Sequence, residues 1–233
     1  MKVFRAKSEI LPAAQQAVWP YLNPVTQLGY VLYGGTAIAL RLGHRQSVDF
    51  DFFTNNDIDK QEIFSRLVIP GSMTVLQDEA NTLTLNFSPD EYDDYVKISF
   101  FGGLNIGRVG EPELTEDQVL QVASFEDLMA TKCKVLLQRI ESKDYIDIAA
   151  LIKAGVHLDA GLAAAECMYK PTFQPSEALK ALVYYEGGDL SLLSDDDKQI
   201  LIDAVSQVRD LPHIAMKNRL LPTSEQDADT IKS

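Results

Sequence analysis

Two aspartates and a glycine pair are the residues of this chain whose types and spacing suit chemistry on phosphates. Asp49 and Asp51 stand two positions apart in the segment Val-Asp-Phe-Asp-Phe-Phe, residues 48–53. In a strand, residues two apart project from the same face. Gly34-Gly35-Thr36 lies upstream, between a β-prone run and a stretch that favours helix. Glycines let the backbone approach a ligand closely, and a helix N-terminus attracts anions. This triplet therefore predicts a phosphate-binding site, with the Thr36 hydroxyl as a further hydrogen-bond donor.

Paired carboxylates beside a phosphate-binding site favour Mg²⁺ bound together with a nucleoside triphosphate, because Mg²⁺ prefers hard oxygen ligands. Each feature alone has a simpler interpretation: a Gly-Gly pair is usually a turn, and Asp-x-Asp is often a solvated strand face. Their combination in one strand–turn–helix–strand unit is more specific. Apolar residues at 48, 50, 52 and 53 also predict that the strand is buried around the acids, and buried carboxylates need a metal or a cationic partner.

Two blocks of the sequence resemble a known family. The run from Tyr33 to Phe53, with Gly-Gly-Thr near its start and Asp-Phe-Asp near its end, resembles the AbiEii/AbiGii-type nucleotidyltransferases of the polymerase-β-like superfamily. The second block, Asp127-Leu-Met-Ala-Thr-Lys132 followed by Arg139, Lys143-Asp144 and Asp147, is similar to the downstream block of that family. The resemblance covers roughly residues 28–155, and the order of its two blocks is specific.

The resemblance implies a role for each matching position. Gly34, Gly35 and Thr36 would hold the triphosphate, and Asp49 and Asp51 would ligate Mg²⁺. Lys132 would reach toward the phosphates, with Asp144 and Asp147 on a helical lobe facing the same cleft. Members of this family transfer nucleotides from NTPs, in some toxins onto the acceptor end of tRNA, and an antitoxin encoded next to the toxin neutralises it.

The residues themselves leave several alternatives open. Ser47 either positions a metal-bound water or caps a turn, and Lys97 could contact phosphate from the face that carries the acids. In the downstream block, Asp144 and Asp147 share a helix face, since they are three positions apart. A salt-bridged helix pair is the alternative there: it suits Arg139 and Lys143 as well as a functional role does, whereas we favour a functional role for Lys132 and Asp144.

Position 99 departs from the superfamily, which usually supplies a third carboxylate from a later strand. The matching position here holds Ser99, which cannot contribute the negative charge that helps to bind a second Mg²⁺. This substitution is compatible with one-metal chemistry, with a different base, or with a protein that binds nucleotide without transferring it.

The elements that must position these residues follow from hydrophobic periodicity and turn residues. We expect helices over 9–23, 36–42 and 59–67, with strands over 30–33, 48–53, 73–77, 82–88 and 95–101. Further helices are predicted over 125–140, 144–154, 159–169, 176–186 and 195–209, followed by a frayed polar tail from Pro222. The predicted fold class is α+β: a polymerase-β-like nucleotidyltransferase core (1–112), a mixed sheet with flanking helices, followed by a helical C-terminal lobe (113–233) that completes the cleft.

The composition of the chain argues against two classes of protein, general nucleic-acid-binding proteins and membrane-spanning proteins. The 233 residues carry a net charge of -13, which argues against a surface that binds nucleic acid generally, because phosphate neutralisation supplies most of that affinity. No apolar run reaches the roughly 18–20 residues that span a bilayer, and with only two cysteines a cytoplasmic location is expected.

The sequence therefore predicts a cytoplasmic, Mg²⁺-dependent nucleotidyltransferase that moves a nucleotide from an NTP to a hydroxyl of RNA (tRNA among the candidates) or protein. We expect it to act as a toxin of a toxin–antitoxin or phage-defence system, with a cognate antitoxin and no membrane partner. The alternative is a non-catalytic nucleotide-binding or interaction protein on the same fold.

Overall fold

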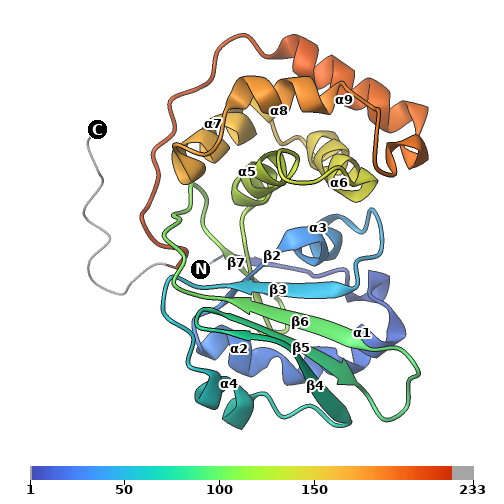
Figure 1. Cartoon of the computed structure of the whole chain (residues 1–233), viewed down its shortest axis with the longest axis vertical. Coiled ribbons are helices and arrows are strands. Elements are labelled where there is room, and N and C mark those ends of the chain that lie inside the picture. Colours follow the sequence, from blue (N-terminus) through green and yellow to red (C-terminus); the bar gives the residue numbers. More distant parts are fainter. Residues whose placement is uncertain (1, 222–233) are drawn as a thin grey trace. The chain divides into compact units, whose positions relative to one another are not determined.

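The computed structural model describes residues 2–221, which form two compact units (Figure 1). The first contains residues 2–106, 111–123 and 219–221, and the second contains residues 107–110 and 124–218. The polar tail predicted from Pro222 onward lies outside the described residues. Each unit is treated separately below.

The first unit is built on an eight-stranded mixed sheet with the order β1-β7-β8-β2-β3-β6-β5-β4. Strands β3 and β6 run parallel to each other, and β2 runs antiparallel to β3 on its other side. The strands are β1 (Val3–Phe4), β2 (Val31–Tyr33), β3 (Asp49–Phe53), β4 (Ser72–Glu79), β5 (Thr82–Ser88), β6 (Val96–Phe101), β7 (Glu113–Thr115) and β8 (Gln121–Val122).

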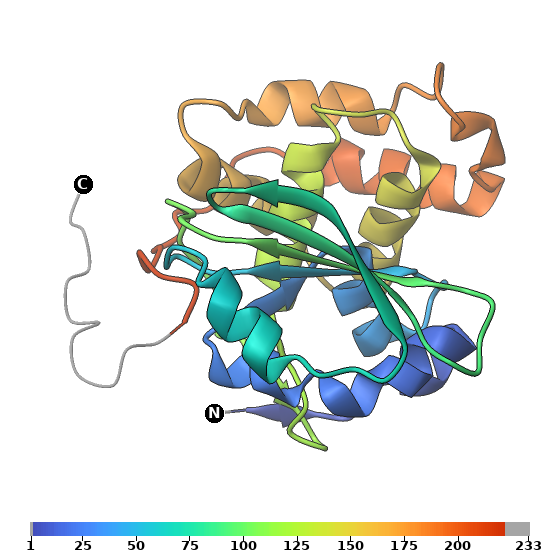
Figure 2. The same ribbon diagram turned by 60° about the horizontal axis from the view of Figure 1, so that its bottom comes forward.

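Strand alternation puts the aspartates of β3 on one face of the sheet and Phe50 and Phe52 on the other. Phe50 and Phe52 of β3 stand opposite Ile98 and Phe100 of β6, and all four side chains are fully buried. The short helices α1 (Ala13–Val18), α2 (Asn23–Gln27) and α4 (Lys60–Arg66) cover this side, as Figures 1 and 2 show. Helix α3 (Gly34–Leu42) lies on the other side, where the aspartates of β3 also project.

The prediction of one continuous helix over residues 9–23 was wrong. The segment is instead divided into a 3₁₀ turn (Ser8–Ile10), α1, a second 3₁₀ turn (Trp19–Tyr21) and α2. Prolines explain the divisions, because a proline has no N–H to donate and fits only near a helix start. Pro12 is the N-cap of α1, and Pro24, where the predicted helix ended, occupies the first turn of α2.

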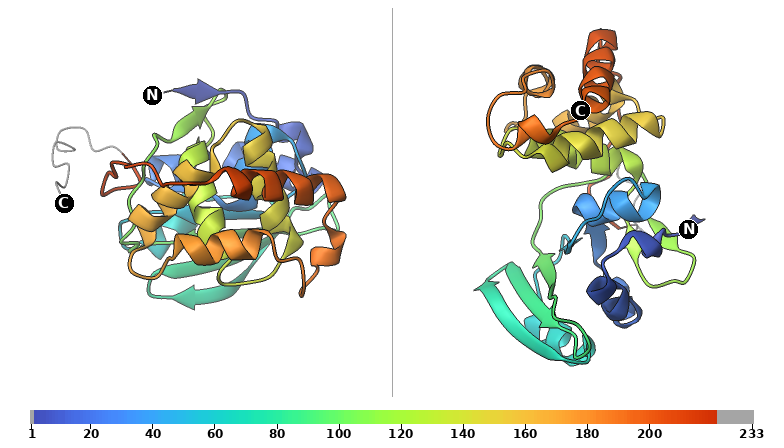
Figure 3. Two further views of the ribbon diagram at one scale, coloured as in Figure 1. Left: turned by 90° about the horizontal axis from the view of Figure 1, so that it is seen from above. Right: turned by 90° about the vertical axis from the view of Figure 1, so that its right-hand side faces the viewer.

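The second unit is helical (Figure 3). Its helices are α5 (Phe125–Val135), α6 (Ser142–Lys153), α7 (Leu158–Tyr169), α8 (Pro175–Leu182) and α9 (Asp195–Gln207). Ser124 starts α5 as a side-chain cap, since its hydroxyl accepts a hydrogen bond from the Asp127 N–H at 3.1 Å. A mixed sheet with flanking helices and a helical C-terminal portion confirms the predicted fold class. Within residues 2–221, no helix combines the length and hydrophobicity needed to cross a bilayer.

Candidate active site

The turn from β2 into α3 brings backbone close to the acidic strand. Gly34 is the first residue of α3 and has φ +77°, a conformation that favours glycine. A Cβ atom placed on Gly34 would lie 2.6 Å from Asp51 Oδ2, so this position leaves room only for a hydrogen. No side chain caps α3 in the described part of the chain, and its first turn carries no acidic residue. The start of α3 therefore keeps N–H groups and the positive end of the helix dipole for an anion.

Strand β3 presents both predicted ligands on the α3 side of the sheet. Asp51 pairs with Tyr33 of β2 in register, which places it directly beside the Gly34 turn. Asp49 lies two residues earlier, and its backbone carbonyl accepts a hydrogen bond from the Thr36 hydroxyl. The bond joins α3 to the start of β3, so Thr36 already has a structural partner. The prediction that Val48 is buried beside the acids was wrong: it is 57% exposed and precedes the strand.

A second close approach occurs at Gly35. A Cβ atom there would lie 2.5 Å from Arg45 Nη2 and 2.9 Å from Ser47 Oγ. Arg45 also donates from Nη1 to the Gln46 carbonyl at 2.8 Å, which helps to hold the loop before β3. The loop thus places a guanidinium and a hydroxyl against the glycine turn, next to the start of α3, where both are suited to contact phosphate oxygens.

Strand β6 supplies the residues next to the acids on the same face. Lys97 pairs with Asp49 in register, and its Nζ lies 3.5 Å from Asp49 Oδ1. Ser99 pairs with Asp51, and its hydroxyl accepts a hydrogen bond from Thr84 Oγ1 of β5 at 3.5 Å. Within the described residues, no three His, Cys, Asp or Glu side chains are grouped as a metal site. The register shows why: a lysine and a serine occupy the positions beside the two aspartates.

The donor set of this face nevertheless fits one hard divalent cation. Asp49 and Asp51 offer carboxylate oxygens on a rigid strand, and the Asp49 side chain is 35% exposed, so a ligand can reach it. Lys97 supplies a positive charge beside Asp49 and partly offsets the repulsion between the two carboxylates. A cation would have to share Asp49 with Lys97, while phosphate oxygens of a bound nucleotide could complete its coordination.

The remaining predicted residues form a separate cluster in the second unit. Lys132 of α5 lies 2.7 Å from Asp144 Oδ1 and 2.7 Å from Asp147 Oδ2, both on α6. Arg139 donates to Asp144 from Nε at 2.8 Å and from Nη2 at 3.1 Å. The Lys132 side chain is 5% exposed and the two aspartates are fully buried. This arrangement joins α5 to α6, as the alternative of a salt-bridged helix pair requires, and the catalytic roles of these residues stay predictions.

Two carboxyl groups of the second unit have pKa values that are shifted from the usual carboxyl value, in opposite directions. Burial alone would raise the pKa of Asp144, but the hydrogen bonds and positive charges of Arg139 and Lys132 outweigh it and hold that pKa below its usual value. Burial raises the pKa of Asp127 to about 6, against the opposing effect of hydrogen bonds from Val109 and Ser124. Asp127 therefore organises the start of α5, while Asp144 is the charged centre of the cluster.

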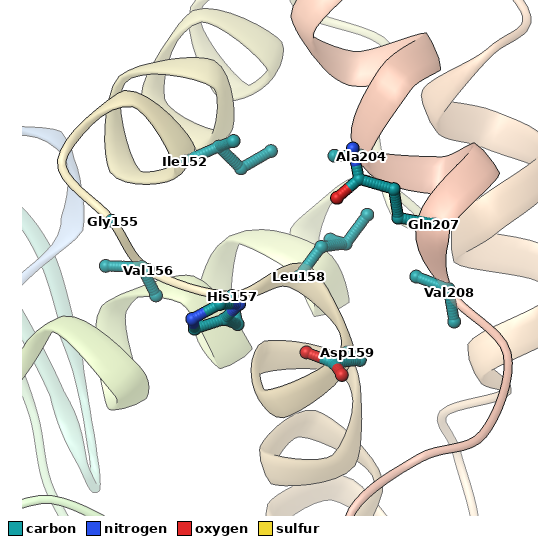
Figure 4. A pocket seen from close by; sticks show the side chains of 9 residues that line it. All are labelled: Ile152, Gly155, Val156, His157, Leu158, Asp159, Ala204, Gln207 and Val208. Atoms are coloured by element: carbon teal, nitrogen blue, oxygen red, sulfur yellow. The ribbon is translucent and has the colours of Figure 1, made fainter.

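The second unit also contains a pocket of about 330 Å³, shown in Figure 4. It lies between the end of α6, the start of α7 and the end of α9, and its lining is mixed, with polar and apolar groups. His157, Asp159 and Gln207 are its polar members. With a single carboxylate, this pocket lacks the paired acidic groups that the predicted chemistry requires.

The first unit thus brings together a glycine turn, an uncapped helix start and two carboxylates of one strand on a mixed sheet. This combination defines the class of nucleotidyltransferases. The chain belongs to the AbiEii family: residues 26–228 match the model described as Nucleotidyl transferase AbiEii toxin, Type IV TA system.

Other known proteins are also similar to this chain. An uncharacterized protein of Aquifex aeolicus (strain VF5) is 30% identical over 172 residues, which cover 71% of this chain and 80% of that protein. Among solved structures, an H. pylori protein assigned to the nucleotidyltransferases is similar with a TM-score of 0.54 at 16% identity, over 83% of this chain and 90% of that one. MenT4, a nucleotidyltransferase toxin from Mycobacterium tuberculosis H37Rv, has a TM-score of 0.50 at 13% identity, over 84% and 91% of the two chains. At these identities the solved structures establish the fold.

Sequence reasoning missed the polar side of β5. Thr84 and Asn86 pair in register with Ser99 and Lys97 of β6, so they extend the face that carries the aspartates. The alternation Thr-Leu-Thr-Leu-Asn-Phe-Ser at residues 82–88 carried this signal, because its polar members fall on one side of a strand. The side to which they belong is fixed only by the pairing of β5 with β6.

Proposed function

We propose that this chain is a Mg²⁺-dependent nucleotidyltransferase that moves a nucleotide from an NTP to a hydroxyl of an RNA, with tRNA the first candidate, or of a protein. The observation that carries the proposal is the close approach of Asp51 to the Gly34 turn, at the uncapped start of α3. Membership of a toxin family implies a cognate antitoxin and a nucleotide substrate. We expect the reaction to take place in the cytoplasm.

In this reaction the acceptor hydroxyl attacks the α-phosphorus of the NTP, the bond from that phosphorus to the bridging oxygen breaks, and pyrophosphate leaves. We assign triphosphate binding to the backbone N–H groups of Gly34 and Gly35, with Thr36, Ser47 and Lys97 as further polar contacts. Asp49 and Asp51 would hold Mg²⁺, which when bound neutralises negative charge that develops on the phosphate oxygens. Lys132, Asp144 and Asp147 complete the proposed set of site residues, as the family resemblance implies.

A specific observation favours a second candidate, a nucleotide-binding protein without transferase activity. Ser99 pairs in register with Asp51, and Lys97 lies 3.5 Å from Asp49 Oδ1. A hydroxyl and an ammonium group next to the two acids leave this face without a third carboxylate to accept the proton of the attacking hydroxyl. Such a protein would bind NTP and show no turnover.

Incubation with each α-³²P-labelled NTP, total cellular RNA and Mg²⁺ separates the two candidates. We expect labelled RNA from the native chain and none from Asp49→Asn, because the variant lacks one of the two ligands on β3. The matched control is Asp203→Asn, an exposed aspartate of α9 that should leave labelling unchanged. Nucleotide binding without labelling of RNA or protein would establish the second candidate, and Asp49-independent labelling would remove β3 from the mechanism.

Thermal unfolding gives a readout that does not depend on turnover. A ligand that binds only the folded state raises the melting temperature. Mg²⁺ with a non-hydrolysable NTP should therefore raise the melting temperature of the native chain more than that of Asp49→Asn. Equal shifts in the two proteins would contradict a metal site at Asp49.

A further inference from the structure

The outer strand of the sheet on the β5 side is long and uncovered. β4 (Ser72–Glu79) is the last strand in the sheet order, and it pairs with β5 along its inner side. Alternate N–H and C=O groups of such a strand point away from the sheet and can bond to another strand. The opposite edge is β1, which has two residues. The right-hand view of Figure 3 shows the β4–β5 hairpin at the margin of the sheet.

All eight residues of β4 are exposed, including three large apolar side chains. Met73 is 44% exposed, Val75 43% and Leu76 55%. The register shifts between Val75 and Gln77, which leaves Leu76 as the extra residue of a bulge. Natural sheets often protect a long edge with lysine or proline within the strand, and β4 contains neither, so the bulge at Leu76 interrupts the edge at one point only. Outward backbone groups and exposed apolar side chains on one edge are the features to which a partner strand binds.

Acidic residues lie at both ends of β4. Its first residue, Ser72, pairs with Ser88, and the exposed turn that follows Ser88 contains Asp90, Glu91, Asp93 and Asp94. Asp78 and Glu79 form its last two positions, where Lys60 of α4 pairs with Asp78. The edge is therefore apolar in the middle and negative at its flanks.

This distribution of charge disfavours pairing with a second copy of the chain. In an antiparallel pair of β4 strands, the Asp78–Glu79 end of each copy would lie beside the acidic turn of the other. In a parallel pair, the same acidic ends would lie side by side. Like charges placed opposite each other on neighbouring strands are destabilising, so the flanks act against self-association.

We propose that β4 is a docking edge for an extended segment of a different, basic polypeptide, which adds to the sheet as a further strand. Main-chain hydrogen bonds to the outer side of β4 would hold the segment, while its alternate apolar side chains contact Met73 and Val75. Lysine or arginine residues on either side of its apolar part would pair with the acidic turn and with Glu79. This interaction is independent of the transferase proposal, because it uses none of the residues of the glycine turn or of the acidic pair.

A designed peptide tests the chemistry of this edge. The probe is a fluorescein-labelled peptide with Val-Thr alternation in the centre and two lysines at each end, titrated against the full chain by fluorescence anisotropy. We expect saturable binding that weakens with salt, and protection of residues 72–79 in hydrogen–deuterium exchange. A peptide with glutamates in place of the lysines should bind at least tenfold more weakly.

Variants of the protein complete the experiment. Met73→Lys combined with Val75→Lys should weaken binding at least tenfold, because it adds positive charge and removes apolar contact. The matched control, Leu192→Lys combined with Ile202→Lys, alters two exposed apolar residues of the second unit and should bind as the native chain does. Fluorescence of Trp19 checks the fold of the first unit in every variant.

Four results would overturn the proposal. The first is absence of binding by the lysine-flanked probe, and the second is equal binding of the glutamate-flanked one. The third is protection outside residues 72–79. The fourth is a dimer of the native chain that the Met73→Lys, Val75→Lys variant dissociates in sedimentation. That dimer would assign the edge to a second copy.

Discussion

Replacement of Gly34 by alanine tests whether the glycine turn and Asp51 act as one site. Gly34 has φ +77°, so an alanine there adopts the left-handed region at a cost of about 1–2 kcal/mol. The added methyl group would also lie 2.6 Å from Asp51 Oδ2, closer than non-bonded atoms allow, and 3.5 Å from Asp51 Cβ. The carboxylate must then rotate from its preferred position, which costs about 0.5–1.5 kcal/mol. The total destabilisation expected is roughly 1.5–3.5 kcal/mol.

Gly29 provides a matched control in the same unit. Its φ of +81° is nearly the same, but an added Cβ would meet only Leu221 Cδ1 at 3.9 Å, an ordinary contact. Gly29→Ala should therefore lower the free energy of unfolding only by the cost of the left-handed backbone conformation, about 1–2 kcal/mol. Trp19, the only tryptophan, is buried in this unit at 6.4 Å from the Phe50 ring, so its fluorescence reports unfolding of both variants in urea.

The two variants should differ far more in ligand binding than in stability. Rotation of Asp51 moves a proposed metal ligand, so Gly34→Ala should bind Mg²⁺ with nucleotide at least tenfold more weakly in calorimetry and lose RNA labelling. Gly29→Ala should retain both. Equal losses in the two variants, or unchanged binding in Gly34→Ala, would refute the idea that Gly34 is required by its closeness to Asp51.

The second unit carries the remaining predictions. Lys132→Met should destabilise it by about 3–5 kcal/mol in urea unfolding, since two buried carboxylates lose the ammonium group that they share, whereas the exposed control Lys153→Met should destabilise it by about 0–1 kcal/mol. Because the pKa of Asp144 is lowered, its stabilising contribution should be lost as pH falls below the usual carboxyl value of 3.8; unfolding followed from pH 5 to pH 2 would show no such loss if the cluster did not stabilise the fold. The pKa of Asp127 is raised from 3.8 to about 6, so the sign is opposite: its contribution is full below 3.8 and is lost as pH rises through 6. Asp127→Asn should remove this dependence, and an unchanged slope of stability against pH between 4 and 6 would contradict it.

The sequence predicted the strands and helices of the first unit correctly where a single hydrophobic periodicity dominated a segment. The alternation at residues 49–53 placed both aspartates on one strand, and Gly34-Gly35 marked the start of α3. The helix predicted over 59–67 begins at Asp59 as its cap, whose carboxylate accepts a hydrogen bond from the Glu62 N–H at 2.9 Å. These features depend on neighbours a few residues away, which the sequence displays directly.

The same patterns failed where short elements depend on distant partners. β1, β7 and β8 have two or three residues each and were not predicted. They exist because they pair with one another or with β2, so their hydrogen bonds are supplied by segments far along the chain. The prediction that Val48 is buried beside the aspartates was also wrong. Val48 lies outside the paired strand, so no strand pairing places its side chain in the core.

The sequence by itself determined which residues are available for chemistry on phosphates: two same-face carboxylates, a glycine turn and a following helix. Tertiary structure alone decided what lies next to them. Parallel pairing of β3 with β6 puts Lys97 beside Asp49 and Ser99 beside Asp51, and the fold of the 43–48 loop puts Arg45 against Gly35. The physical reason is that strand periodicity fixes the face of a side chain, a local property, whereas its neighbours across a sheet depend on a register that is set by packing of the whole unit.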